Sequence, residues 1–111
     1  MAGLEPRYEA LAASIVLQAA DDYKRYRFMI DTIDYRKYKD DYGRYIAMMR
    51  ANREIKSVEY FFHSPWFYAL SGLNGDKAFV GLKRTYEEEY YPERMEELLD
   101  VTRQGRYRFG Q

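Results

Sequence analysis

The sequence predicts an all-α protein, a small antiparallel bundle of four or five helices that includes one short helix capped by Ser-Pro. Apolar residues recur at spacings of three and four along most of the chain, which is the period of a helix face. No segment alternates apolar and polar residues as a strand would. With 111 residues, of which 18% are aromatic, the chain has the size and composition of one folded domain. We therefore expect a single helical domain over residues 1–105 and a flexible basic-aromatic tail over residues 106–111.

The first predicted helix covers residues 4 to about 30. Pro6 fits the first turn of such a helix, where its missing N–H would have had no partner. One stripe of apolar or aromatic residues follows the helix: Tyr8, Leu11, Ile15, Ala19, Tyr23, Tyr26, Ile30 and Ile33. Residues 10–20 are apolar nearly all round, so we expect this helix to be buried on more than one side.

A break is expected at residues 31–34, because Asp and Thr side chains compete with the helix by hydrogen-bonding nearby backbone; Asp34 is then a candidate cap. The second predicted helix covers residues 35 to 62, with a kink or interruption allowed near Asn52. Its core stripe consists of Met48, Ala51, Ile55, Val58 and Phe62, and is extended backward by Tyr45 and Tyr38. Its opposite face is basic and carries Arg36, Lys37, Lys39, Arg44, Arg50 and Arg53.

An aromatic corner follows the second helix. Pro65 ends that helix, because the residue before a proline is driven out of helical geometry. Ser64 is a natural cap for a short helix over residues 65–71, and Gly72 is a natural left-handed stop. The rings of residues 66–68 either pack into one end of the bundle or stack on a base. Pro65 and Gly72 bound the segment as compact structure, which favours packing into the bundle. A buried Trp66 would then contribute about 3–5 kcal/mol to stability.

The last part of the chain predicts one or two further helices. Asn74 and Gly75 form a turn signal, and Asp76 is a candidate cap. The apolar side of the next helix consists of Phe79, Val80, Leu82 and Tyr86. Pro92 either kinks this helix or allows a new one to start at Glu93. A final helix would have an apolar face of Met95, Leu98, Leu99 and Val101, and would stop at Gly105.

The formal net charge is zero, which argues against a partner recognised by charge alone, such as nucleic acid bound without sequence preference. The sum hides an asymmetry. Residues 24–56 contain ten Lys or Arg and five Asp or Glu, a net of +5, whereas residues 85–104 contain seven acids and two arginines, a net of −5. Side-by-side packing of the two segments is the simpler interpretation. A basic face left open for phosphates is the alternative.

The sequence lacks the residues that several kinds of functional site require. The chain has no cysteine, so it has no disulfide and no thiolate metal site. Its single histidine, His63, is expected to be structural, and the carboxylates of residues 87–97 are expected to be solvated. There is no phosphate loop or nucleotide fingerprint. We predict no catalytic residues, no metal and no cofactor, and expect a non-enzymatic protein. The longest apolar run is too short for a bilayer, so we expect a soluble cytoplasmic protein without a membrane partner.

Tyrosines alternate with Arg and Lys in the middle of the chain, and this interleaving predicts the binding site. Cations and rings serve both protein–protein hot spots and nucleic acids. The zero net charge favours a protein partner, with a nucleic-acid or small-nucleotide binding module as the alternative. A purely solvated amphipathic face is the simplest explanation, and a homodimer also remains open. The predicted binding residues are Lys24, Arg25, Arg27, Tyr35, Arg36, Tyr38, Arg44 and Arg50.

Two segments, residues 11–23 and 55–84, resemble a known family. The residues that carry the resemblance are Leu-Ala-Ala-Ser-Ile-Val-Leu-Gln-Ala, then Phe-Phe-His-Ser-Pro-Trp-Phe at 61–67, and the Asn74-Gly75 turn. This pattern is similar to that of uncharacterised small helical accessory proteins from phages, prophages and mobile elements of Gram-positive bacteria. The resemblance implies a host or phage protein as partner, and a role such as inhibiting host defence in an anti-CRISPR-like or other anti-defence manner. The tyrosine-rich middle and the chain beyond about Tyr86 depart from the family pattern.

Overall fold

The computed structural model describes residues 6–91, 93–94 and 97. Their main elements are α1 (Pro6–Asp31), the 3₁₀ turn η1 (Ile33–Tyr35), α2 (Asp41–Phe62), α3 (Pro65–Ser71) and α4 (Gly75–Glu89). Over this part of the chain there is no strand, and the all-helical prediction is confirmed. Helical geometry ends at Glu89 and returns at Glu93, so the break lies where Pro92 predicts it. The predicted apolar face of residues 95–101, the stop at Gly105 and the tail of residues 106–111 lie outside the described residues.

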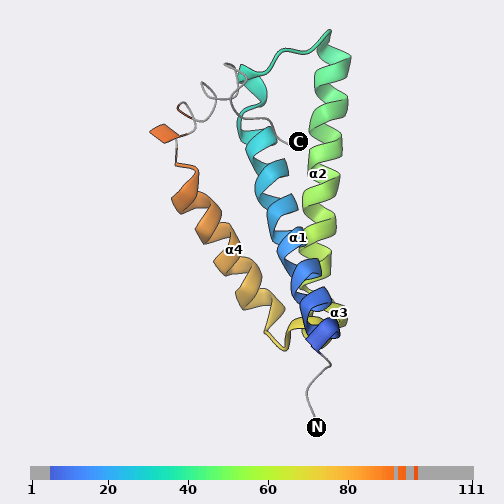
Figure 1. Cartoon of the computed structure of the whole chain (residues 1–111). Helices are drawn as coiled ribbons and strands as arrows, with labels where there is room; N and C mark the ends of the chain where they lie inside the picture. Colours follow the sequence, from blue (N-terminus) through green and yellow to red (C-terminus); the bar gives the residue numbers. More distant parts are fainter. Residues whose placement is uncertain (1–5, 92, 95–96, 98–111) are drawn as a thin grey trace.

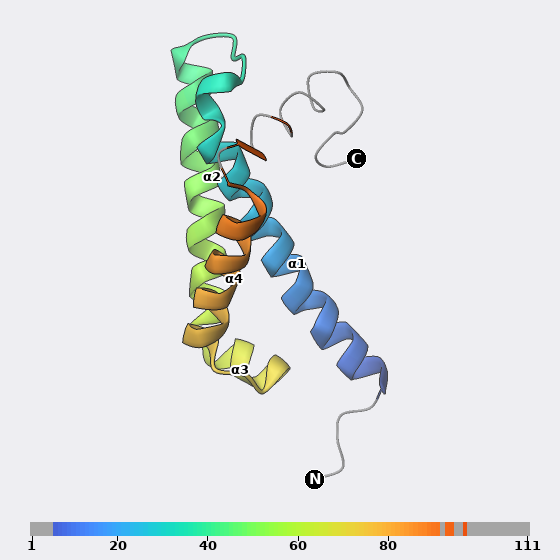
Figure 2. The same cartoon turned by 90° about the vertical axis from the view of Figure 1, so that its left-hand side faces the viewer.

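Helices α1 and α2 lie side by side, and the chain reverses direction between them through residues 32–40 (Figure 1). Helix α3 lies at the end where α2 finishes, and it contacts both long helices. Helix α4 then returns along the other side of α1 in the same view. The turned view shows that the N-terminal half of α1 diverges from α2 and α4 (Figure 2). That half of α1 is therefore covered less than the half near Asp31.

The core is mainly aromatic and joins all four helices. Its buried members are Tyr23, Phe28, Val58, Phe62, Phe67, Phe79, Leu82 and Tyr86. The ring of Tyr23 meets Phe79 edge-on with centroids 5.4 Å apart, and Phe62 stacks on Phe67 at 4.6 Å. Such ring pairs add to the area that each ring buries. Helices α1 and α4 are thus joined by long side chains that span the space between their backbones.

The second helix starts later than predicted. Asp34 lies in η1 and does not cap α2; the cap is Asp40, whose carboxylate accepts from the N–H of Gly43 at 2.7 Å. The reason lies in Thr32, which is fully buried and donates its hydroxyl to the carbonyl of Phe28 at 2.6 Å. After Thr32 the chain forms the 3₁₀ turn η1, in which the N–H of Tyr35 donates to the Thr32 carbonyl at 3.0 Å, and this tight turn delays the next helix. From Asp41 onward α2 is continuous, with no interruption at Asn52.

The corner after α2 matches the prediction in its caps. The Ser64 hydroxyl accepts from the N–H of Phe67 at 3.3 Å, and Gly72 adopts the left-handed φ of 71°. The predicted cap of α4 is wrong by two residues. Asn74 caps the helix by accepting from the N–H of Lys77 at 3.0 Å, whereas the Asp76 carboxylate lies 2.5 Å from Nδ1 of His63.

Burial corrects three expectations. On α2 the core stripe is confirmed at Ala51, Val58 and Phe62, but its predicted extension, Tyr45, is exposed. Trp66 is 54% exposed, so the corner is plugged by Phe67, which is 1% exposed. The N-terminal half of α1 is not buried on several sides: Tyr8, Leu11 and Leu17 are all exposed. Helix α1 diverges from its neighbours there, so only the face that carries Ala12 and Val16 is covered.

Candidate binding surface

Two of the predicted binding residues take part in the contact between α1 and α4. Nζ of Lys24 lies 3.0 Å from Oε2 of Glu89, and Nη2 of Arg27 lies 3.3 Å from Oε1 of Glu87. The acidic end of α4 therefore lies beside the basic turn of α1. For these residues the charge asymmetry is explained by side-by-side packing, and their charges are compensated within the molecule.

Arg27 is the centre of this contact. Its Nη1 donates to the phenolic oxygen of Tyr23 at 2.7 Å, and its guanidinium lies 4.5 Å from the ring centroid of Tyr86. The Tyr86 hydroxyl donates to Asp31 at 2.8 Å. Burial raises the pKa of both phenols, and for Tyr86 the bond to Asp31 raises the pKa further. Arg27 thus donates to the hydroxyl of the buried Tyr23 and lies over the core ring of Tyr86, which is a structural role.

Arg25, Arg36 and Arg44 also have partners inside the molecule. Arg25 donates to Asp22 at 3.1 Å. Arg36 donates through Nε to the buried Thr32 hydroxyl at 3.0 Å, and Arg44 forms an ion pair with Asp34. The contacts of Arg36 and Arg44 brace the turn between α1 and α2, whereas that of Arg25 lies within α1.

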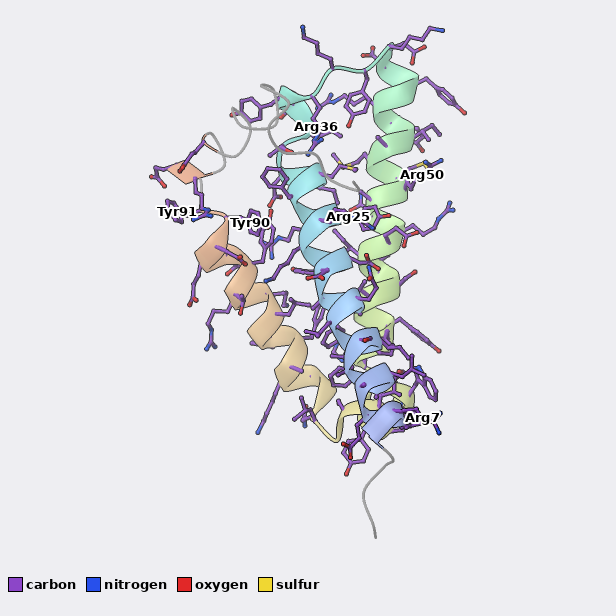
Figure 3. All side chains as sticks on the ribbon, in the orientation of Figure 1. Arg7, Arg25, Arg36, Arg50, Tyr90 and Tyr91 are labelled. Atoms are coloured by element: carbon purple, nitrogen blue, oxygen red, sulfur yellow. The ribbon has the colours of Figure 1, made fainter. Side chains whose placement is uncertain are left out.

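The last three predicted residues come from three successive segments of the chain. Tyr35 is exposed in η1, Tyr38 is half-buried in the following loop, and Arg50 is exposed on α2. Figure 3 shows that the labelled Arg25, Arg36 and Arg50 come from α1, the connecting turn and α2. The eight predicted residues therefore come from α1, from α2 and from the turn between them, and five of the eight have partners within the molecule.

A different surface is formed along the solvent side of α2. Its members recur at spacings of three and four opposite the core stripe, and they are Tyr42, Tyr45, Met49, Arg53, Lys56 and Tyr60, called the outer strip below. All are exposed, with Tyr42 at 71% and Tyr60 at 79%. From first to last member the strip spans about 27 Å, at 1.5 Å of rise per residue. A hollow along its second half is lined by Met49, Arg53, Lys56 and Tyr60 together with Asn52 and Ser57.

Sequence reasoning missed most of the outer strip, although a signal was present. Helix α2 carries two sets of apolar or aromatic residues at helical spacing, and Tyr45 was assigned to the wrong one. An extended stripe through Tyr45 ignores the angular drift of an α-helix: Tyr45 lies about 120° from Ala51 around the helix axis, at 100° per residue, and so cannot share its face. Arg53 was correctly placed opposite the core.

The histidine of the chain takes part in a contact between two helices. His63 lies between Asp76 and Glu59, with Nε2 4.0 Å from the Glu59 carboxylate, and so joins the end of α2 to the start of α4. No group of three His, Cys, Asp or Glu side chains in residues 6–91, 93–94 and 97 could hold a metal ion. Within the same residues, none of the helices has the length and apolar character that a bilayer crossing requires. No family model, curated protein or solved structure matches this chain at a significant level.

Proposed function

We propose that this chain is a non-enzymatic accessory protein of a phage or mobile element, and that it acts by binding a protein partner through the outer strip of α2. The observation that carries the proposal is the strip itself, in which three tyrosines and a methionine are exposed beside Arg53 and Lys56. The proposal takes the four helices as a small antiparallel bundle that holds the strip rigid. The mobile-element context and the cytoplasm of a host cell are what the sequence resemblance implies, and a component of host defence is the partner that it favours.

The composition of the outer strip fits a protein partner. Tyr, Met and Arg are enriched in protein interfaces, and Tyr and Arg dominate their hot spots. A tyrosine contributes a large contact area with few rotatable bonds, so little conformational entropy is lost on binding. The contacts of Arg25, Arg27, Arg36 and Arg44 also support the outer strip, because they engage these four cations within the molecule.

The net charge around the outer strip favours a protein partner over a nucleic-acid partner. Residues 42–60 contain four basic residues, Arg44, Arg50, Arg53 and Lys56, and two acids, Glu54 and Glu59, so their net charge is about +2. Non-specific affinity for nucleic acid comes from many phosphate contacts, and each adds to the salt dependence. A strip this long with so little excess charge offers few such contacts.

A nucleic-acid or small-nucleotide binding module is the second candidate. The observation that favours it is the exposure of the Tyr42 and Tyr60 rings on the same helix face as Arg53 and Lys56, since bases stack on aromatic rings beside cations. Binding of this kind would weaken steeply as salt is raised. A protein interface with a mainly aromatic core would weaken much less.

Affinity capture from a host lysate with two matched variants tests the proposal. The strip variant combines Arg53→Glu, Lys56→Glu and Tyr60→Ala. The control combines Lys77→Glu, Arg84→Glu and Val80→Ala, three exposed positions of α4. Both variants reverse two charges and truncate one exposed side chain, so both should keep the wild-type melting temperature within a few degrees.

We expect the strip variant to lose a partner protein that the wild type and the α4 control both retain. Equal capture by the two variants would overturn the proposal. The second candidate would instead be established if the wild type binds DNA, RNA or nucleotide in a salt-dependent manner, and the strip variant loses this binding without losing any protein.

A further inference from the structure

The hollow on the outer strip is a groove between two rows of side chains. Along the surface of a helix, residues four apart form ridges, and neighbouring ridges are separated by grooves. The residues that line the hollow belong to two such ridges of α2: Met49, Arg53 and Ser57 form one, and Asn52, Lys56 and Tyr60 form the other. All six are exposed, and the hollow has a volume of about 680 Å³. It is therefore an open groove that follows one helix.

Two cations lie on opposite sides of the middle of this groove. Arg53 is the central residue of one ridge and Lys56 is the central residue of the other. Among the described residues, neither of them forms an ion pair, whereas Lys24, Arg27 and Arg44 are paired with carboxylates of this chain. The middle of the groove therefore carries two positive charges that no described carboxylate neutralises.

The two ends of the groove are uncharged. Met49 and Asn52 line one end, and Ser57 and Tyr60 line the other. Met49 lies about 16 Å from Tyr60 along the helix axis, at 1.5 Å of rise per residue. An occupant thus meets an exposed apolar or aromatic side chain near each end, with positive charge between them.

The shape of the groove favours a helix as its occupant. A groove between ridges of this kind accepts a ridge of another helix, and three ridge residues spaced four apart span only about 12 Å. An extended peptide commonly binds by adding a strand to a sheet edge. The described part of the chain contains no strand and offers no such edge.

We propose, on the basis of the proposed function, that the partner protein inserts an acidic amphipathic helix into this groove. An Asp or Glu in the middle of one ridge of that helix would accept hydrogen bonds from Arg53 and Lys56. Apolar residues three or four positions before and after the acid would contact Met49 and Tyr60. Charge-assisted hydrogen bonds to a carboxylate are among the stronger ones. A basic residue in the same place would be repelled, so the two cations give the groove its specificity.

Helix α4 carries a comparable hollow that lacks this chemistry. It is lined by Asp76, Lys77, Val80, Gly81 and Arg84. Asp76 places a carboxylate beside the cations, and none of the lining residues is aromatic. Reversing the charges of Lys77 and Arg84 therefore provides a matched control for reversing those of Arg53 and Lys56.

Selection from a displayed library of helical peptides, randomised on one face, tests the proposal without a known partner. The full wild-type chain is the target, and the double variant Arg53→Glu with Lys56→Glu is used for counter-selection. We expect the selected peptides to share one Asp or Glu, with large apolar residues three or four positions away on both sides. The absence of any selected peptide, or selected peptides without this acid, would overturn the proposal.

Charge exchange between peptide and protein is the second test, measured by fluorescence anisotropy. The double variant of Arg53 and Lys56 should bind a selected peptide about tenfold or more weakly than the wild type does. A peptide with Lys in place of the acid should reverse this preference and bind the double variant more tightly than the wild type. Lys77→Glu with Arg84→Glu should keep the wild-type affinity within about twofold. Failure of the Lys peptide to prefer the double variant would contradict the pairing.

Proline in the middle of a selected peptide tests the helical conformation, because it breaks a helix. Binding should be lost, and retained binding would overturn the proposal in favour of an extended segment. The lysate capture described above separates this inference from the proposed function. If the strip variant loses a host protein while no acidic helix is selected, this inference fails and the proposed function stands. If acidic helices are selected while the strip variant captures every protein that the wild type captures, the proposed function fails, and only the preference of the groove for acidic helices is retained.

Discussion

Two adjacent aromatic residues in α3 should differ sharply in their contribution to stability. Phe67 is 1% exposed and packs between Phe61, at a centroid distance of 5.7 Å, and Phe62, at 4.6 Å. Phe67→Ala removes a ring from the junction of α2 and α3 and leaves a cavity, so we expect a loss of about 3–5 kcal/mol. For a domain of this size that corresponds to a fall in melting temperature of roughly 12–20 °C.

Trp66 supplies the contrast. More than half of its surface is in water already, and no enclosed cavity opens when the ring is removed. Only the transfer free energy of the covered part is lost, which is about 1–2 kcal/mol. Helix propensity opposes part of even this loss, because alanine is the better helix former.

Urea denaturation followed by circular dichroism measures both variants against the wild type. If Phe67→Ala does not fold, Phe67→Leu replaces it, with an expected loss of about 1 to 1.5 kcal/mol. Acrylamide quenching of the single tryptophan in the folded wild type provides an independent check, since an exposed indole is accessible to the quencher. A loss from Trp66→Ala equal to or larger than that from Phe67→Ala would refute the described orientation of α3.

Two further predictions concern glycine and tyrosine. Gly75→Ala should lower the free energy of unfolding by about 1–3 kcal/mol or more in urea denaturation, because the added Cβ would overlap the carbonyl oxygen of Phe62. At Gly81 an added Cβ meets no atom within 4 Å, so Gly81→Ala should stabilise the protein by about 0.5–1 kcal/mol through its helix propensity in α4. Burial raises the pKa of the Tyr23 and Tyr86 hydroxyls above that of a tyrosine in the unfolded chain. Below about pH 10 the two hydroxyls are protonated in the folded and the unfolded protein alike, whereas just above about pH 10 they lose their protons only in the unfolded protein. The free energy of unfolding should therefore fall as pH rises beyond about 10, and a urea midpoint that is unchanged there would contradict the burial of these phenols.

Local chemistry made much of the fold predictable. Ser64, Pro65 and Gly72 act within a few residues of themselves, so their roles as cap, first residue and left-handed stop follow from residue type alone. The stripe of Ala51, Val58 and Phe62 is also local, because helical period fixes which residues share a face.

Cap choice was less predictable, because several polar residues compete near each helix start. Asp34 and Asp40 both precede α2, and Asp34 is taken up by the 3₁₀ turn that follows the buried Thr32. Its burial depends on tertiary packing. In the same way Asn74 and Asp76 both precede or begin α4, and the contact of Asp76 with His63 involves a residue from another helix.

The surface proposed for binding was the least predictable feature. Lys24 and Arg27 look available in the sequence, and their partners Glu89 and Glu87 are more than fifty residues away along the chain. The charge asymmetry predicts that the two segments pack side by side, but no local pattern reveals which residues pair. The predicted burial of Trp66 is wrong for a related reason. Composition shows that the corner is aromatic, but only the packing of α3 determines that Phe67 is buried and Trp66 is exposed.

The claim that the outer strip of α2 contacts a partner is tested most directly by site-specific photocrosslinking in the host. A photoreactive amino acid at Met49, on the outer strip, and another at Val80, exposed on α4, report the two faces separately. We predict a covalent adduct with one host or phage protein from position 49 and none from position 80. An adduct with that protein from position 80 alone would contradict the assignment of the partner to α2.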